Sequence, residues 1–371
     1  MKKFVRVLAM TTAVVALLSP VVTMPSVALA DEYDDQTEQT PIVKNGDPDF
    51  NRKVDALLKK NNFCGSVLVM EDGKPLYTKS VGYANKSQKI KNNSNMTYEI
   101  DSIQKNLTAG LIMKLVEQGK INLNDHLNKY FPNIPGGNLI TLRQMLDMKS
   151  GLVLPGNGPK KVLPDNKIVD SDIGSITFSK VMLNKWQYSP INFVLLARIV
   201  EKVTHKTYKQ VFTKEYIDKL HLKQTTFAYG SSHGVNKAQG YTNRNPLSPD
   251  LNYHNPYITK PFETRDELGT GQVFMSPHDL FKLENYIVSG NMLTKESRQI
   301  LFVPASISTY GGGFYNNHAS HSANGWGYGF QSVVHISDDG QTAVVVMSNY
   351  QRLANDNKPM ASQIYSLAVQ Y

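Results

Sequence analysis

The chain contains 371 residues, of which 41% are hydrophobic and 19% charged, so it is long enough for one or two domains with a large core. Its formal net charge is +9, but no dense run of lysine and arginine occurs, which argues against nucleic-acid binding. Cys64 is the only cysteine, so an intrachain disulfide is excluded. The apolar sequence around Cys64 predicts a small buried side chain.

The first 30 residues have the pattern of a secretory signal peptide. Basic residues precede an apolar stretch at 7–18, and Ala28-Leu29-Ala30 is a typical cleavage site. We therefore expect a secreted or envelope-associated protein, with an uncleaved signal acting as a membrane anchor as the alternative. The polar, acidic residues 31–50 are predicted to form a flexible linker, and residues 51–371 the folded domain.

Removal of the signal takes away three of the basic residues, so the net charge falls from +9 to +6. A basic exported protein suits the anionic polymers of a cell envelope, although ordinary surface charge explains the value equally well.

Apolar patterns predict strands at both ends of the domain and helices between them. Hairpins are expected at 65–79 and at 332–348. Helices are expected near 50–61, 102–118, 142–148, 190–205, 276–290 and 357–370. Residues 153–186 and 240–268 are expected to be irregular loops. This order predicts an α+β fold, in which an antiparallel sheet built from both chain ends is flanked by helices and a mostly helical insert spans roughly 120–310.

Ser102 and Lys105 form the only Ser-x-x-Lys pair in the chain, at the start of an apolar helix. Residues three apart share one face of a helix, so the Lys105 amine is expected to reach the Ser102 hydroxyl. A serine hydroxyl becomes a good nucleophile when a base accepts its proton. A lysine base near neutral pH needs a pKa about 3 below its usual value of about 10.4, a cost of about 4 kcal/mol that burial can supply. A capping serine followed by a solvated lysine is the alternative.

Several further segments occur in a characteristic order after this pair. They are Leu115–Lys120, Leu123–Asp125, Tyr130–Pro132, Leu142–Leu152 and Gly269–Phe274. Together with Ile100–Lys105 they resemble the serine penicillin-binding proteins and class C β-lactamase-like hydrolases, a family that includes D-alanyl-D-alanine carboxypeptidases and related esterases. The resemblance covers about residues 52–367 and implies a β-lactamase/transpeptidase-like fold.

The second motif of this family is Tyr-x-Asn, and its counterpart here is Tyr188-Ser189-Pro190. The resemblance implies that Tyr188 transfers protons between Ser102, Lys105 and the leaving group. In the family the asparagine contacts an amide of the substrate. Pro190 has no side-chain donor, so amide substrates, including β-lactams, are less expected here.

The third motif of the family begins with lysine or histidine on a strand, and His321-Ser322-Ala323 resembles the histidine form. The resemblance makes His321 the fourth catalytic residue, with His318 as the alternative. The two histidines lack the spacing of a metal site, so neither a metal nor another cofactor is expected. The backbone amides of Ser102 and Asn324 are expected to stabilise the oxyanion, and Ala323 and Gly325 to line the substrate site.

These features predict an exported serine hydrolase that forms an acyl-enzyme on D-alanyl esters or D-alanyl peptides of the cell envelope. Pro190 and the basic charge favour an esterase, for example one acting on D-alanylated teichoic acid. A D,D-carboxypeptidase or weak penicillin-binding protein is the main alternative, and a catalytically silent binding protein of the same fold is another. The expected partner is a polymer, either peptidoglycan or teichoic acid, and not a nucleic acid.

Overall fold

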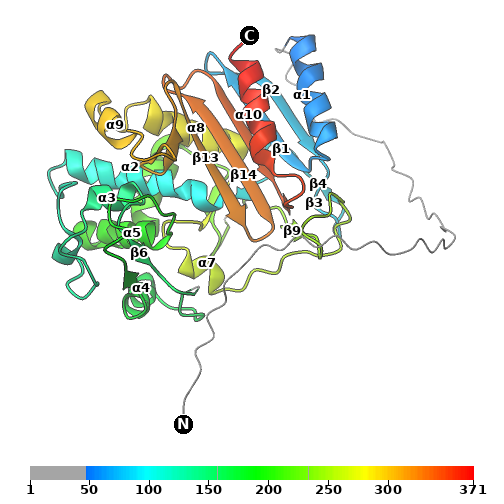
Figure 1. The fold of residues 1–371 in the computed structure, drawn as a ribbon. Helices are drawn as coiled ribbons and strands as arrows, with labels where there is room; N and C mark the ends of the chain where they lie inside the picture. The colour runs from blue at the N-terminus through cyan, green and yellow to red at the C-terminus, as the bar shows by residue number, and fades with distance from the viewer. Residues whose placement is uncertain (1–46, 157, 233) are drawn as a thin grey trace, which may run out of the picture. The chain divides into compact units, whose positions relative to one another are not determined.

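The computed structural model describes residues 47–156, 158–232 and 234–371. The predicted signal peptide and most of the predicted linker lie outside these residues. A seven-stranded antiparallel sheet dominates the described part, with the strand order β11-β12-β13-β14-β15-β1-β2 (Figure 1). Its strands are β1 (Gly65–Glu71), β2 (Lys74–Val81), β11 (Tyr310–Gly311), β12 (Phe314–Asn316), β13 (Ser320–Gly327), β14 (Phe330–Ser337) and β15 (Ala343–Ser348).

The remaining strands form small sheets around this one. They are β5 (Tyr98–Glu99), β10 (Val273–Met275) and β8 (Thr225–Phe227) in one sheet, and the pairs β16 (Tyr350–Gln351) with β9 (Tyr241–Thr242), β3 (Tyr83–Asn85) with β4 (Ile90–Lys91), and β6 (Leu152–Val153) with β7 (Thr177–Phe178). The described residues belong to one compact unit.

The helices are α1 (Pro48–Lys60), α2 (Gln104–Glu117), α3 (Leu142–Leu146), α4 (Asp165–Ile173), α5 (Ile191–Thr204), α6 (Tyr208–Phe212), α7 (Glu263–Asp266), α8 (Pro277–Val288), α9 (Lys295–Leu301) and α10 (Asn357–Ala368). Two 3-10 turns, η1 (Asp101–Ile103) and η2 (Leu127–Lys129), and a π-helical turn, η3 (Thr213–Asp218), complete them. Within the described ranges, none of these helices has both the length and the apolar character needed to span a membrane.

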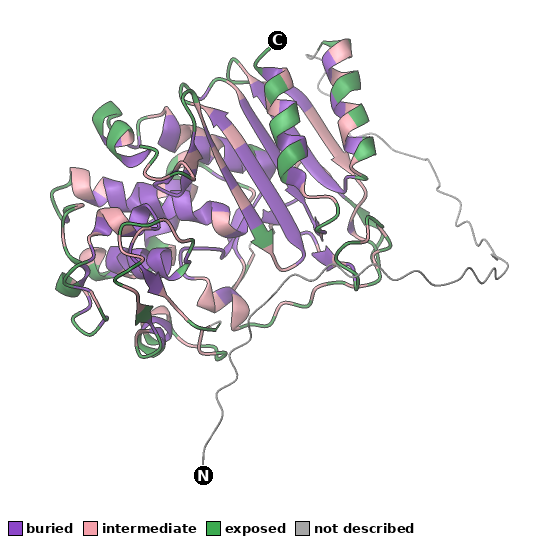
Figure 2. Ribbon diagram, in the orientation of Figure 1, coloured by how far each residue is buried: buried purple, intermediate pink, exposed green. Residues whose placement is uncertain are grey.

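The strands β1, β14 and β15 of the large sheet are buried on both faces, because helices from different parts of the chain cover them (Figure 2). α1 and α10 pack on one face, where Val67 and Val69 of β1 join their core. Leu68 and Met70 point to the opposite face and join the larger core, which includes α2, α5 and α8. This alternation explains why β1 reads as a continuous apolar run.

The α+β architecture with a sheet built from both chain ends is confirmed, as are both predicted hairpins and the buried state of Cys64. Two segments expected to be irregular contain short elements: α4 and β7 lie within 153–186, and β9 and α7 within 240–268. The first helix begins at Pro48 because the Asp47 carboxylate caps it, accepting a hydrogen bond from the Asp49 amide at 2.6 Å.

Candidate active site

Ser102 lies in the η1 turn, which connects β5 to the buried helix α2. The preceding residue, Asp101, has φ +43°, in the left-handed region that is uncommon for a residue with a side chain. Such strained backbone clusters at functional sites, where the surrounding structure holds it in place. The predicted helix start at Ser102 is therefore a 3-10 turn that continues as α2 from Gln104.

Strand β13 passes close to this turn, and a glycine makes the approach possible. A Cβ atom on Gly325 would lie 2.1 Å from the carbonyl oxygen of Ile100 and 2.9 Å from Cβ of Asp101. Because any side chain at this position would collide with backbone, only glycine allows β13 to contact the nucleophile turn. Gly325 was expected to line the substrate site. In the structure, its lack of a side chain allows β13 to lie close to the turn that carries Ser102.

Three of the four predicted catalytic side chains meet at the Ser102 hydroxyl. The Lys105 Nζ atom donates a hydrogen bond to Ser102 Oγ at 2.8 Å, and the Tyr188 hydroxyl donates to the same atom at 2.9 Å. Lys105 is only 1% exposed, and its Nζ also donates to the Thr270 carbonyl oxygen at 3.5 Å. Ser102 Oγ is thus held between an amine and a phenol, each of which can exchange a proton with it.

A pocket of about 270 Å³ opens in front of this cluster. Ser102 and Tyr188 line it together with the predicted residues Ala323 and Asn324. Its other lining residues are Tyr310, Gly313, Tyr315 and Trp326. The two tyrosines were missed because β11 and β12, which carry them, are too short to stand out as an alternating pattern.

The structure does not bring His321 into this pocket, so its predicted catalytic position needs correction. His321 is the second residue of β13 and lines a different cavity, which His318 also lines. Its ring packs against Phe302 and Phe314. A strand rises about 3.3 Å per residue, so the imidazole is two to three residues, roughly 7–10 Å along β13, from the positions that face Ser102.

The polar contacts of His321 join it to neighbouring residues outside the Ser102 pocket. Its Nδ1 atom lies 2.7 Å from Asn316 Oδ1, and its Nε2 atom 3.1 Å from Asp338 Oδ1. Burial lowers the pKa of His321 to about 4, so the imidazole is neutral at neutral pH.

The position of the absent asparagine in the second motif is occupied by Pro190, which precedes α5. Asn192, two residues later, does not replace it. Its side-chain amide donates to the Ser189 carbonyl oxygen at 3.0 Å and contacts Met148 Sδ at 3.5 Å, within the protein interior. Neither residue offers an amide donor to the Ser102 pocket.

Buried carboxyl groups lie directly behind the nucleophile. Burial raises the pKa of Asp101 well above its usual range, the negative charge of Glu267 raises it further, and the positive charge of Lys105 opposes the shift. Burial and the charge of Asp101 likewise raise the pKa of Glu99. One oxygen of each carboxyl group has no hydrogen-bond partner, as expected for groups that favour their uncharged form. Among the described residues, no group of three or more histidine, cysteine or acidic side chains is arranged to hold a metal ion.

Comparison with known proteins agrees with this geometry. The sequence model of the beta-lactamase family matches residues 50–368. The chain is 30% identical over 321 residues to the penicillin-binding protein PbpX of Bacillus subtilis (strain 168), covering 86% of this chain and 78% of that protein. It is 27% identical over 335 residues to the teichoic acid D-alanine hydrolase of Staphylococcus aureus (strain MRSA252), covering 86% and 81% of the two chains.

Solved structures agree as well. The crystal structure of FmtA from Staphylococcus aureus superposes with a TM-score of 0.75 at 25% identity, over 87% of this chain and 89% of that one. The D-amino acid amidase from Ochrobactrum anthropi SV3 shares the fold, with a TM-score of 0.72 at 19% identity over 87% and 99% of the two chains. The matched family and the paired Ser102 and Lys105 side chains make this protein a serine hydrolase. The chain belongs to the beta-lactamase family.

Proposed function

We propose that this protein is an exported esterase that removes D-alanyl groups from an anionic polymer of the cell envelope, with D-alanylated teichoic acid as its substrate. The observation that carries the catalytic part is the pair of hydrogen bonds that Ser102 Oγ accepts from Lys105 and Tyr188. The similarity to a teichoic acid D-alanine hydrolase supports the substrate class. Export rests on the predicted signal peptide, which lies outside the described residues.

In the proposed first step, Lys105 Nζ accepts the Ser102 proton while Ser102 Oγ forms a bond to the ester carbonyl carbon. Negative charge develops on the carbonyl oxygen, and the backbone amides of Ser102 and Asn324 are the proposed donors to it. The bond to the alcohol of the polymer then breaks, and Tyr188 supplies the proton that the departing oxygen needs.

The product of this step is a D-alanyl ester on Ser102. Water attacks its carbonyl carbon and gives a proton to the same Lys105 and Tyr188 pair. The bond to Ser102 Oγ breaks, D-alanine leaves, and the Ser102 hydroxyl recovers its proton. Each step therefore uses the two hydrogen bonds already formed at Ser102 Oγ, and no further reactant is required except water.

An ester is favoured over a peptide because of Pro190. An alkoxide leaving group needs less assistance than an amine, and Pro190 offers no side-chain donor or acceptor for a substrate amide. The similarity to a penicillin-binding protein keeps D,D-carboxypeptidase activity as the competing function. A silent binding protein of the same fold is less compatible with a buried lysine hydrogen-bonded to a serine that lines an open pocket.

The test is release of D-alanine from purified D-alanylated teichoic acid by the purified protein, compared with the Ser102→Ala variant. We expect release by the parent protein and none above background by the variant. Equal rates would refute the esterase. Labelled penicillin followed by peptide mapping distinguishes the competing function, because a penicillin-binding protein would carry the label on the peptide that contains Ser102.

A further inference from the structure

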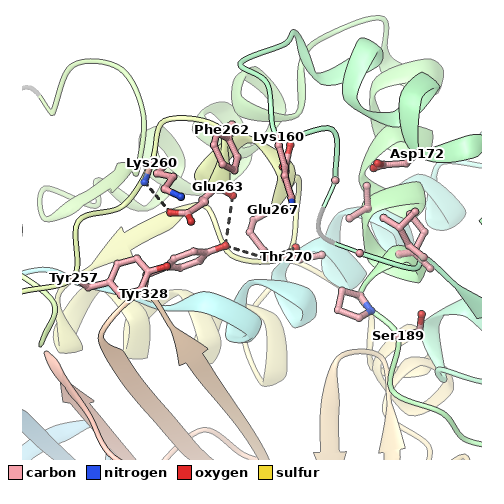
Figure 3. A pocket seen from close by; sticks show the side chains of 17 residues that line it. Lys160, Asp172, Ser189, Tyr257, Lys260, Phe262, Glu263, Glu267, Thr270 and Tyr328 are labelled. Carbon is pink, nitrogen blue, oxygen red and sulfur yellow. Dashed lines mark hydrogen bonds between the residues drawn. The ribbon is translucent and has the colours of Figure 1, made fainter. Parts of the chain in front are cut away.

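Figure 3 shows the residues that line a second cavity, of about 450 Å³. Ser189 and Pro190 form part of its wall, whereas the preceding residue, Tyr188, lines the Ser102 pocket. Thr270 lines the cavity as well, and its carbonyl oxygen accepts a hydrogen bond from Lys105 Nζ. The cavity and the catalytic cluster are therefore joined through neighbouring residues of two loops.

The wall of this cavity carries an excess of negative charge. Four carboxylates line it, and only two lysines accompany them. The carboxylates are Asp172, Glu263, Asp266 and Glu267, and the lysines are Lys160 and Lys260. None of the four forms an ion pair with any residue in the ranges that the structure describes. The two lysines of the wall are therefore not ion-paired with these carboxylates.

Two of the carboxylates are held in place by neutral hydrogen-bond donors. Glu267 accepts hydrogen bonds from the Thr270 hydroxyl at 2.6 Å and from the Tyr328 hydroxyl at 3.2 Å. Glu263 accepts one from the Lys260 backbone amide at 2.7 Å. Figure 3 shows these contacts along one side of the cavity.

The carboxylate of Asp172 gives separate evidence that the cavity binds a positively charged ligand. It lies on α4, is only 4% exposed, and its carboxylate makes no hydrogen bond to the described residues. Burial and the charge of Asp266 raise the pKa of Asp172 to about 7, and burial raises that of Asp266 to about 6. A buried carboxylate without a partner is costly, so this side chain is suited to a ligand that brings a positive charge.

Apolar and aromatic side chains line much of the remaining wall. Leu154, Ile191, Val194, Phe262, Tyr257 and Tyr328 line it beside the carboxylates. A hydrated metal ion would gain little from such surfaces, whereas an ammonium group with a small apolar body would contact both kinds of wall. Tyrosine rings also attract organic cations through their faces.

We propose that this cavity is a subsite for an organic ammonium ion, and that its occupant during catalysis is the free ammonium group of a D-alanyl ester on the polymer. The identity of that occupant rests on the proposed function. Every unreacted D-alanyl ester carries one such group, so the subsite would select D-alanylated segments of the polymer over bare ones. The carboxylates would also repel the bare polyanion and so favour its release after D-alanine has been removed.

The test is binding of D-alanine methyl ester to the Ser102→Ala variant at pH 7, measured by calorimetric titration. In the Ser102→Ala background, Asp172→Asn should weaken binding by at least about tenfold, because it removes a charge-assisted contact. Asp170→Asn is the matched control, since Asp170 lies exposed on the same helix outside the cavity, and it should leave the affinity unchanged. N-acetyl-D-alanine methyl ester lacks the ammonium group and should bind weakly to all three proteins.

Equal affinity of the parent and Asp172→Asn forms, or equal binding of the acetylated ester, would overturn the subsite. Should Asp172→Asn lose its native circular dichroism spectrum, Glu263→Gln tests the same cavity from a different element, α7. In proteins with Ser102 intact, Asp172→Asn should raise KM for the D-alanylated polymer, whereas the control Asp170→Asn should leave both this KM and the hydrolysis of p-nitrophenyl acetate unchanged. If the protein releases D-alanine from the polymer but does not bind the ammonium ester in this cavity, only the subsite is refuted. If it binds the ammonium ester but releases no D-alanine, only the esterase is refuted.

Discussion

Glu284 provides the sharpest prediction for stability, because it is a fully buried acid beneath the nucleophile helix. Its Oε1 atom accepts a hydrogen bond from Asn106 Nδ2 at 2.8 Å. Glu284 Oε2 and Asn106 Oδ1 are both buried without a partner. Two unpartnered acceptor oxygens favour a protonated Glu284, because the protonated carboxyl supplies a donor that the charged form lacks. Burial raises the pKa of Glu284 to about 8, although the Asn106 hydrogen bond opposes the shift.

The sign of the effect follows from proton binding. The folded protein holds the Glu284 proton more tightly than the unfolded chain, whose carboxyl has its usual pKa of 4.5. The stabilising contribution is therefore complete below pH 4.5 and is lost as the pH rises through about 8. Each pKa unit corresponds to about 1.4 kcal/mol, so the stabilising contribution is on the order of several kcal/mol, and most of it is lost between pH 5 and pH 8.

The perturbation is Glu284→Gln, which places a permanent donor where the carboxyl proton lies. We expect the free energy of unfolding of the variant, relative to the parent, to increase by roughly 3 kcal/mol between pH 5 and pH 8. Urea denaturation followed by tryptophan fluorescence at four pH values measures this difference. Glu296→Gln is the control, since Glu296 is exposed on α9 and should give a constant difference. Parallel curves for the parent and Glu284→Gln would refute a buried, protonated Glu284.

Three further predictions concern the site itself. Gly325→Ala should abolish ester hydrolysis, because its Cβ would lie 2.1 Å from the Ile100 carbonyl oxygen; normal kcat/KM in the variant would contradict the close approach of β13. Tyr188→Phe should lower kcat by about 100-fold or more through loss of the proton donor to Ser102, measured with a chromogenic ester, and an unchanged rate would exclude that role. His321→Gln should leave kcat/KM unchanged between pH 6 and 8, because the imidazole lies outside the Ser102 pocket; a large loss in a folded variant would return His321 to the catalytic set.

Much of the arrangement could be predicted from local sequence. The spacing of Ser102 and Lys105 on one helical turn was enough to expect their contact, because i and i+3 residues share a face in any helix. The alternating and continuous apolar runs of β1, β2, β14 and β15 were enough to expect a sheet built from both chain ends. The contact of Tyr188 with Ser102 was expected from the order of motifs, which carries information that spacing alone does not.

The third motif marks the limit of such reasoning. His321, Ala323 and Gly325 lie on one strand at alternate positions, and sequence alone did not reveal which of them would lie opposite the nucleophile. The residue that lies opposite the nucleophile depends on the position of β13 along the η1 turn. Gly325 determines this position, because any other residue there would collide with the Ile100 carbonyl oxygen. The acidic cavity is equally non-local. Its carboxylates come from α4 and from residues 263–267, which are about 90 positions apart in the sequence and share no pattern. Local periodicity reports which face of an element is buried, whereas only packing between distant elements determines what that face meets.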